Sequence, residues 1–499
     1  MGSYTRTLFI GVDAGDKELI LHWARAGELP TFRRLFDEAA WATTVNPPAL
    51  FVGSIWPSFY TSLSPTKHGR YCFNQLRSGT YETPKFLPSQ TKGSAFWSVL
   101  GQAGKKVAVI DIPKSTLDPS LNGMQVVDWV THDPDEGFRT QPPSLTREIE
   151  NKYGLDPIGI CDGKRQSAAD FKTFRDKLLQ RVRMKEELSS SVLGQGGWDA
   201  FLTTFTESHC VGHQCWHLWD KTHPRYDAAL AAEVGNPILE VYRAIDAAIG
   251  RLWEKVGPET PLIVLASHGM GPHYEATFFF NEILKKLDRR SPAAASGSLS
   301  LKEIARRLWH VIPRSIRQHL FKDLKQQLNK EADGRRYYQV PNNDVHAGVR
   351  INKIGREPKG CVSSDEFETV RDELITDLMG LKNAESGEPL VLGVHRIEDL
   401  YPGLDTSALP DLVLEWNRSK PIRAAASPKI GRIEGDYEGC RTGDHKSSGL
   451  FFAAGPPFTK GRLPQAVSVM DFGPTIASLL GVDLGRVDGR SFIDRVHAR

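Results

Sequence analysis

The segment Thr206–His217 holds three histidines within nine residues, directly after the apolar run Ala200–Phe205. His209 and His213 lie four residues apart, so they share one face if the segment is helical. Two imidazoles at this spacing can bind one metal ion. A single histidine here would be unremarkable, but this density favours a metal centre, with Glu207 as a further candidate ligand.

Three more candidate ligands stand beside other apolar runs, and they are Asp13, His268 and His445. Taken alone, Asp13 would more often be a turn residue or a helix cap. Together with His209 and His213, the set offers one carboxylate and four imidazoles. This inventory suits one or two borderline-soft divalent ions, most simply Zn²⁺, with Mn²⁺ or another transition metal as the alternative.

Ser54 is the candidate nucleophile. It would cap a helix that carries Pro57 in its first turn. A hydroxyl at a helix N-terminus faces N–H groups and the positive end of the helix dipole, which stabilise an alkoxide and an incoming phosphate oxyanion. The simpler interpretation is that Ser54 is only an N-cap, the commonest role of such a serine.

The elements that must position these side chains are buried strands. Short apolar runs recur along the chain with amphipathic helical patterns between them, and they cover residues 8–12, 107–110, 200–205, 261–266, 411–415 and 449–454. Such runs are typical of strands covered by helices on both faces. We therefore expect an α/β fold with a doubly wound, mostly parallel sheet, whose ligands gather at the carboxyl ends of its strands.

Two stretches interrupt this alternation. Residues 115–195 are rich in Pro, Asp and Lys, and residues 285–336 lead from a Ser/Ala/Gly segment into a basic helical pattern. We expect both to be insertions, a cap and a lid, on a catalytic core made of residues 1–114, 196–284 and 337–499. The basic pattern is most simply a solvated helix face. The alternative is a lid that contacts an anionic substrate, a partner or a membrane surface through residues 300–330.

Composition narrows the class of protein further. The net charge of +3 over 499 residues argues against a dedicated nucleic-acid binder. Six cysteines without CxxC spacing indicate free thiols in a reducing compartment. No signal peptide precedes the first apolar run and no run is long enough to cross a bilayer, so we expect a cytoplasmic protein.

The order of these segments resembles the alkaline phosphatase superfamily, in particular its type I phosphodiesterase and nucleotide pyrophosphatase group. The resemblance covers residues 7–110, 198–280 and 340–495. The segments that carry it are Asp13 after the first strand, Trp56–Gly69 (WPSFYTSLSPTKHG), Gly212-His213, His268-Gly-Met, Gly443-Asp-His445, residues 349–360, residues 470–482 and Asp488-Gly-Arg490.

The resemblance implies two metals in one crevice. The first would be held by Asp13, Ser54 and His268, and the second by His209, His213 and His445. The sequence departs from the family pattern because Ser267 and His209 stand where aspartates are usual, and because Ser54 lies three residues before a proline instead of two. Neutral side chains weaken the first site, so the alternative is a single-metal or mixed-metal enzyme, with Glu207 as a substitute carboxylate.

The implied activity is hydrolysis of small-molecule phosphate esters, most simply diesters or pyrophosphates, by a metal-activated serine. Ser58 is the second choice of nucleophile, Asn74 is a candidate donor to a phosphate oxygen, and Arg350 and Lys446 are candidates to neutralise its charge. The alternatives are a phosphomonoesterase, a phosphonate or sulfate ester hydrolase on the same fold, and a catalytically silent binding protein. Residues 51–69 lack the Cys/Ser-x-Pro-x-Arg site of sulfatases.

Overall fold

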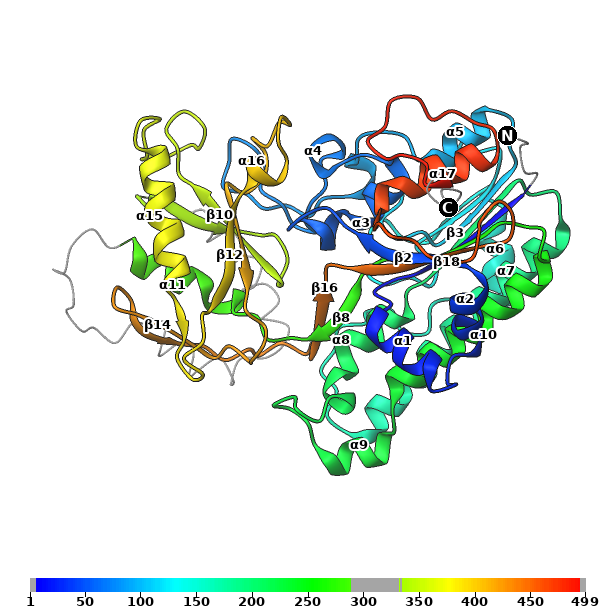
Figure 1. Ribbon diagram of the computed structural model, residues 1–499, viewed down its shortest axis with the longest axis horizontal. Helices are drawn as coiled ribbons and strands as arrows, with labels where there is room; N and C mark the ends of the chain where they lie inside the picture. The colour runs from blue at the N-terminus through cyan, green and yellow to red at the C-terminus, as the bar shows by residue number, and fades with distance from the viewer. Residues whose placement is uncertain (1–5, 289–331, 333, 494–499) are drawn as a thin grey trace. The chain divides into compact units, whose positions relative to one another are not determined.

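The computed structural model describes residues 6–288, 332 and 334–493 (Figure 1). The chain forms two compact units. The first unit contains residues 1–72, 86–273 and 438–499, and the second contains residues 73–85 and 274–437. The expected basic lid, including residues 300–330, falls almost entirely outside the described residues.

The first unit is built on a mixed sheet that, in the described part of the chain, has ten strands. In spatial order they are β18 (Gly461–Arg462), β2 (Ala40–Val45), β17 (Gly449–Ala454), β7 (Leu262–Ala266), β1 (Thr7–Val12), β6 (Ala200–Phe205), β3 (Val107–Ile110), β4 (Gly123–Val127) and β5 (Arg139–Gln141), with β19 (Val467–Ser468) also paired to β2. A separate two-stranded ribbon joins β8 (Gly269–Pro272) to β16 (Gly443–Lys446).

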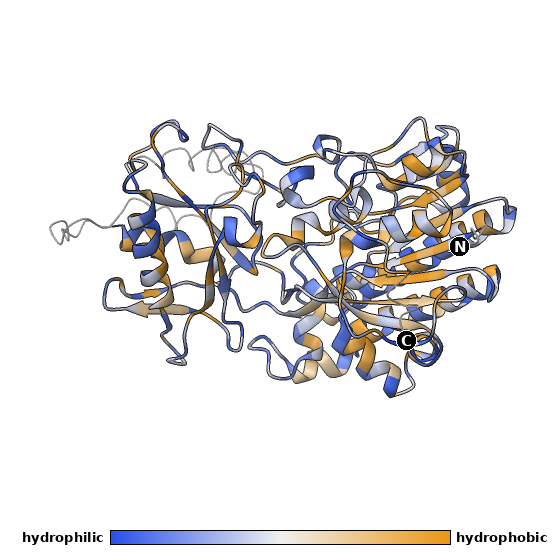
Figure 2. Ribbon diagram, turned by 45° about the horizontal axis from the view of Figure 1, so that its top comes forward, coloured by the Kyte–Doolittle hydropathy of each residue, from blue (hydrophilic) through white to orange (hydrophobic). Residues whose placement is uncertain are grey.

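Most neighbours in the large sheet are parallel, and β5 and β17 run antiparallel to theirs. Figure 2 shows these strands in hydrophobic colours, as expected for a sheet buried on both faces. The expectation of a mostly parallel α/β sheet is confirmed.

Helices cover both faces of this sheet (Figure 1). One layer consists of α1 (Lys17–Arg25), α2 (Pro30–Glu38), α6 (Leu145–Tyr153), α7 (Ala168–Gln195), α8 (Glu207–Trp219), α9 (Ala228–Val234) and α10 (Pro237–Val256). The other layer contains α3 (Phe51–Thr61), α4 (Pro65–His68), α5 (Phe96–Gln102) and α17 (Phe472–Leu479), with the short 3₁₀ turns Pro88–Gln90 and Val469–Asp471 in the same unit.

The alternation of side chains along β1 explains the two layers. Leu8, Ile10 and Val12 belong to the core shared with α7, α8 and α10. Phe9, between them, packs on Phe59 of α3, with ring centroids 4.6 Å apart. Successive strand residues point to opposite faces, so a strand that is apolar throughout needs a helical layer on each side.

The second unit has its own core around a four-stranded antiparallel sheet, in the order β12 (Val391–Arg396), β13 (Leu412–Trp416), β10 (His346–Ile351) and β9 (Tyr337–Val340). A three-stranded sheet contains β11 (Lys382–Asn383), β14 (Ala424–Ser427) and β15 (Gly431–Glu434). The described helices of this unit are α11 (Phe280–Leu287), α15 (Phe367–Met379) and α16 (Ile397–Leu400), with a 3₁₀ turn at Thr277–Phe279.

This division differs from the expected one, because residues 73–85, 274–284 and 337–437 were expected in the catalytic core but belong to the second unit. Residues 115–195 contribute β4, β5, α6 and α7 to the first unit, so they are part of the core and not a cap on it. The apolar run at 411–415 forms β13 of the second unit and not a strand of the large sheet. The reason is that α7 buries its apolar face against α10, whereas β13 pairs antiparallel with β10 and β12.

Two further expectations concern membranes and cysteines. Within the described residues, no helix is both long and apolar enough to cross a membrane. The described part of the chain includes all six cysteines, and no disulfide joins any two of them, in agreement with the prediction of free thiols.

Candidate metal centre

The predicted ligands do gather at one edge of the large sheet. Strands β6, β1 and β7 are parallel neighbours, and Val12 is in register with both Phe205 and Ala266. The residues that follow these strands therefore leave the sheet at one level. They lead into Asp13, into helix α8 and into the pair Ser267-His268.

Three imidazole nitrogens converge at this edge, and we call His209, His213 and His445 the histidine centre. The Nε2 atoms of His209 and His213 are 3.0 Å apart, and that of His445 lies 3.2 Å from the first and 3.1 Å from the second. The first two residues lie one turn apart on α8, as predicted. His445 comes from β16, which packs against α8 (Figure 1).

Hydrogen bonds to the other ring nitrogens decide which atoms carry lone pairs. His213 Nδ1 lies 2.7 Å from the carbonyl oxygen of Gly443. A carbonyl only accepts, so Nδ1 carries the proton and Nε2 presents its lone pair to the centre. Metal-binding histidines are typically oriented in this way by a backbone carbonyl.

A second chain of bonds orients His445. Ser267 Oγ donates to Asp13 Oδ1 at 3.2 Å, and it lies 2.9 Å from His268 Nδ1. The serine proton is used on the carboxylate, so His268 Nδ1 donates to Oγ and His268 Nε2 is left as an acceptor. His445 Nδ1 donates to that Nε2 at 2.9 Å. His445 Nε2 then points its lone pair at the histidine centre.

The imidazoles of the site are neutral at physiological pH. Burial lowers the pKa of His209, His213 and His445 well below the usual value, and neighbouring imidazoles or Arg441 add to the effect. Burial also lowers the pKa of His268, to about 4, against the opposing influence of Asp13. Neutral imidazole is the form that binds metal ions.

The donor set fits a divalent metal ion. Ligand atoms bound at about 2.0–2.1 Å to one tetrahedral Zn²⁺ lie about 3.3 Å apart, close to the separations in the histidine centre. Lone pairs that face one another at such distances repel unless a cation lies between them. Asp444 offers a carboxylate oxygen within 4.8 Å of the ligand nitrogens of His213 and His445.

Asp13 lies beside the histidine centre but does not complete a second metal site. Its Oδ1 accepts from the indole Nε1 of Trp56 at 2.8 Å, and its Oδ2 lies 3.5 Å from His209 Nδ1. His268 Nδ1 is 3.9 Å from Oδ1. Because Ser267 is neutral, Asp13 is the one carboxylate, among the described residues, that contacts both His209 and His268.

The candidate nucleophiles Ser54 and Ser58 do not hydrogen-bond to the histidine centre. Helix α3 begins at Phe51, so Ser54 lies inside the helix and does not cap it. Its Oγ is fully buried and donates to the carbonyl oxygen of Leu50 at 2.6 Å. Ser58 Oγ lies 2.9 Å from Nε2 of His68. Two residues of α3 approach the site: Trp56, whose indole donates to Asp13 at 2.8 Å, and Phe51, whose ring centroid is 6.1 Å from that of His268.

Two other predicted residues have different surroundings. Glu207 is the first residue of α8, and Lys185 Nζ lies 3.8 Å from its carboxylate. Burial raises the Glu207 pKa, and no cluster of metal-ligating side chains in the described residues includes it. Lys446 Nζ contacts Asp16 at 3.0 Å.

The remaining two predicted residues lie in the second unit. Arg350 is buried there and donates to Glu357 at 2.9 Å and to the carbonyl of Ser407 at 2.7 Å, as structural arginines do. Asn74 pairs with Lys85 in an isolated β-bridge. Its assignment as a phosphate donor stays a prediction.

His132 and Asp444 were missed by the sequence analysis. The ring of His132 lies against that of His209, with centroids 3.9 Å apart. It follows β4 by five residues, so the rule that polar residues after a buried strand line the site would have found it. Asp444 stands inside the Gly-x-His motif that was used only for its histidine.

Comparison with known proteins agrees with this fold. The sequence matches the family of type I phosphodiesterases / nucleotide pyrophosphatases over residues 7–447. The chain belongs to this family, and with it to the phosphoester hydrolases of the alkaline phosphatase superfamily. None of the curated proteins matches this sequence.

Two solved structures share the fold. The alkaline phosphatase PafA aligns with a TM-score of 0.52 at 14% identity, over 99% of this chain and 99% of its own. A phosphonoacetate hydrolase from Sinorhizobium meliloti 1021, in complex with phosphonoformate, aligns with a TM-score of 0.51 at 14% identity, over 96% of this chain and 95% of its own. At this identity the likeness establishes the fold alone.

Proposed function

We propose that this protein hydrolyses phosphodiesters or pyrophosphates of small molecules at a single divalent ion held by His209, His213 and His445. The observation that carries the proposal is the convergence of three Nε2 atoms within 3.0–3.2 Å of one another. Three histidines with a fourth position left open are the ligand set of a catalytic zinc ion.

A bound ion would supply a Lewis acid that polarises a phosphate oxygen and counters its charge. The protein's own part is to keep the three lone pairs aligned. The Gly443 carbonyl holds the proton of His213 on Nδ1, and His268 holds that of His445 on Nδ1. The chain of hydrogen bonds ends at Asp13, which accepts from Ser267. The negative charge of Asp13 therefore strengthens the ligands, although Asp13 does not bind the ion itself.

The N-terminal end of α3 is suited to a phosphate beside this centre. The Leu50 side chain forms no capping hydrogen bond, and Phe51 brings the first turn of α3 near His268. The positive end of a helix dipole favours a phosphate group at this position. The surroundings of the site thus combine a cation site with an anion site, as phosphoester cleavage requires.

Water is the attacking group that this geometry supports best. Ser54 is the first candidate nucleophile from the sequence, but its hydroxyl donates to Leu50 and is fully buried. In the proposed reaction, water oxygen bonds to phosphorus, the ester P–O bond breaks, and the leaving oxygen takes up a proton. No phosphoserine forms on this route.

The test is to purify the full chain without chelator, count ions by mass spectrometry and assay bis-p-nitrophenyl phosphate with and without EDTA. We expect one ion bound by the histidine centre and activity that EDTA abolishes and Zn²⁺ or Mn²⁺ restores. Parallel assays on a pyrophosphate, a monoester, a phosphonate and a sulfate ester rank the substrate classes. A protein that binds an ion at this centre but cleaves none of them would be a silent binding protein, contrary to the proposal.

A further inference from the structure

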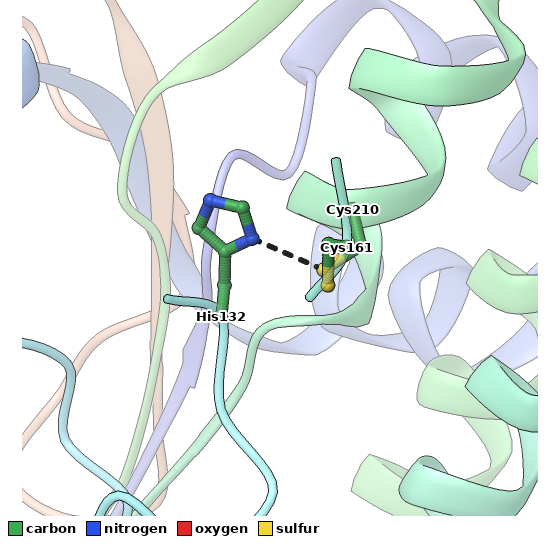
Figure 3. Close-up of side chains that lie close together, drawn as sticks. All are labelled: His132, Cys161 and Cys210. Atoms are coloured by element: carbon green, nitrogen blue, oxygen red, sulfur yellow. Dashed lines mark hydrogen bonds between the residues drawn. The ribbon is translucent and has the colours of Figure 1, made fainter. Parts of the chain in front are cut away.

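A second cluster of ligand atoms lies outside the histidine centre, and we call His132, Cys161 and Cys210 the thiol cluster. Its three ligand atoms lie within 4.8 Å of one another, and His132 Nδ1 is 3.3 Å from Cys210 Sγ. Figure 3 shows the imidazole facing the two sulfurs. Cys210 belongs to α8, whereas His132 and Cys161 come from the loops after β4 and before α7. All three side chains are buried.

The imidazole of the cluster is held by a carboxylate. His132 Nε2 lies 2.9 Å from Asp133 Oδ2. The carboxylate accepts the Nε2 proton, so in the neutral imidazole Nδ1 is the nitrogen whose lone pair faces the sulfurs. This arrangement of carboxylate, histidine and open ring nitrogen is the one that orients zinc-binding histidines.

Both sulfurs also accept a charged donor. Arg181 Nη1 lies 3.3 Å from Cys161 Sγ and 3.7 Å from Cys210 Sγ. The guanidinium is paired with Asp156, at 2.6 Å from Nε to Oδ1 and 2.5 Å from Nη2 to Oδ2. The ion pair is neutral as a unit, so two thiolates would leave a charge of −2 that one divalent ion balances.

We propose that His132, Cys161 and Cys210 bind a thiophilic divalent ion of the Zn²⁺ class, separate from the ion of the histidine centre. An S₂N ligand set favours Zn²⁺ over Mg²⁺ or Mn²⁺. Three protein ligands leave a fourth position for water or another small ligand. The ion would link two loops to α8 at Cys210, the residue next to His209.

The competing chemistry is a disulfide between Cys161 and Cys210. That product needs an oxidant, and it would remove both thiolates from the ligand set. The two readings predict opposite results, because a metal site requires reduced cysteines and a disulfide excludes the ion.

The test is Co²⁺ substitution of the full chain, stripped of metal under reducing conditions. Thiolate ligands on Co²⁺ give a sulfur-to-metal charge-transfer absorption in the near ultraviolet, which a histidine-only site cannot produce. We expect this band in the wild type and in His445→Ala, where the histidine centre is broken. Cys161→Ser and Cys210→Ser should lose it. Cys215→Ser is the matched control, since Cys215 is buried on the same helix outside the cluster, and should keep the band.

A second measurement does not depend on variants that fold. In the wild type, added Zn²⁺ should slow alkylation of Cys161 and Cys210 but leave Cys440 unchanged, as read from peptide masses. Absence of the band in the wild type, its persistence in both cluster variants, or a Cys161–Cys210 disulfide that resists mild reductant would overturn the proposal. His445→Ala keeps this test independent of the proposed hydrolase site.

Discussion

The ring of His132 lies against the ring of His209 at an interplanar angle of 80°, with centroids 3.9 Å apart. One residue belongs to the thiol cluster and the other to the histidine centre. The loop after β4 thus packs against His209, a proposed metal ligand on α8. Substitutions that loosen this contact should displace His209 before they unfold the chain. The reason is that metal binding is lost at smaller displacements of a side chain than packing is.

His213→Ala should abolish the ion of the histidine centre. The substitution removes one of three converging nitrogens and the bond to Gly443. We expect kcat/KM on bis-p-nitrophenyl phosphate to fall at least about 100-fold, equal to about 2.7 kcal/mol of transition-state stabilisation. The control is His217→Ala, one turn further along α8, where the imidazole bonds Thr442 at 3.0 Å. Equal ion content in both variants would contradict the proposed centre.

Ser54→Ala should leave catalysis nearly intact. If water attacks directly, kcat changes by less than about threefold, which is about 0.7 kcal/mol. Stability should fall by about 0.5–1.5 kcal/mol, because the bond from Oγ to the Leu50 carbonyl is lost. Ser58→Ala is the paired control on the same helix. A large loss of kcat in Ser54→Ala alone, with phosphoserine trapped in the wild type, would establish the serine route instead.

Ser267→Asp should create a second ion site. Ser267 Oγ lies 3.2 Å from Asp13 Oδ1, and two carboxylates at that separation repel one another unless a cation joins them. We expect one more ion per chain than in the wild type. In EDTA the variant should be destabilised by about 3–5 kcal/mol, the cost of an uncompensated buried charge. Ser267→Asn controls for size, and an Asp variant with unchanged ion content would refute the expectation.

Gly443→Ala should displace His213 from His445. A Cβ at this position would lie 2.3 Å from the carbonyl oxygen of Gly212, so β16 and α8 would have to separate. Ion affinity should fall at least about tenfold, as when outer contacts of a metal site are lost. In Gly271→Ala on β8, the new Cβ meets only the flexible side chain of Lys446, at 3.0 Å. Titration with Zn²⁺ distinguishes the two, and similar affinities would disprove the steric argument.

His68 should make stability fall in acid. Its Nδ1 accepts from the backbone N–H of Arg70 at 3.1 Å, so protonation would break that bond. Burial, aided by the charge of Arg70, lowers its pKa to about 3. Between pH 6.5 and 3 the unfolded chain therefore binds more protons at this residue than the folded chain. The contribution of His68 to the free energy of unfolding is fully present above pH 6.5. Between pH 6.5 and 3 it falls by about 1.4 kcal/mol per pH unit.

The comparison for this prediction is His68→Asn, whose Oδ1 can accept from Arg70 without titrating. Denaturant unfolding at pH 7, 6, 5 and 4 should show a shallower decline for the variant than for the wild type. Parallel declines in the two proteins would mean that His68 is not the source.

Several parts of the site were determined by the sequence. Residues that follow parallel buried strands must meet at one sheet edge, so Asp13, His268 and the start of α8 could be placed together from their positions alone. The spacing of His209 and His213 requires one helical face. The order of the segments also indicated the family that the comparison confirms.

Other features depended on where an element begins. The sequence predicted a helix capped by Ser54, but α3 starts three residues earlier. That shift places Ser54 one turn inside and turns its hydroxyl back to Leu50. Serine side chains choose between a cap and a bond to the preceding turn according to this boundary, and boundaries are the least certain part of a sequence-based prediction.

Only the tertiary structure decided which polar residues share a site. His132 and Cys161 lie in loops remote from α8 in sequence, and nothing in their local spacing joins them to Cys210. Likewise, the bonds from Ser267 to Asp13 and to His268 come from the register of β1 and β7. The sequence determined the chemical types at the sheet edge, because local periodicity places them there. The distances between them arise from packing of elements far apart in the chain, which periodicity does not encode.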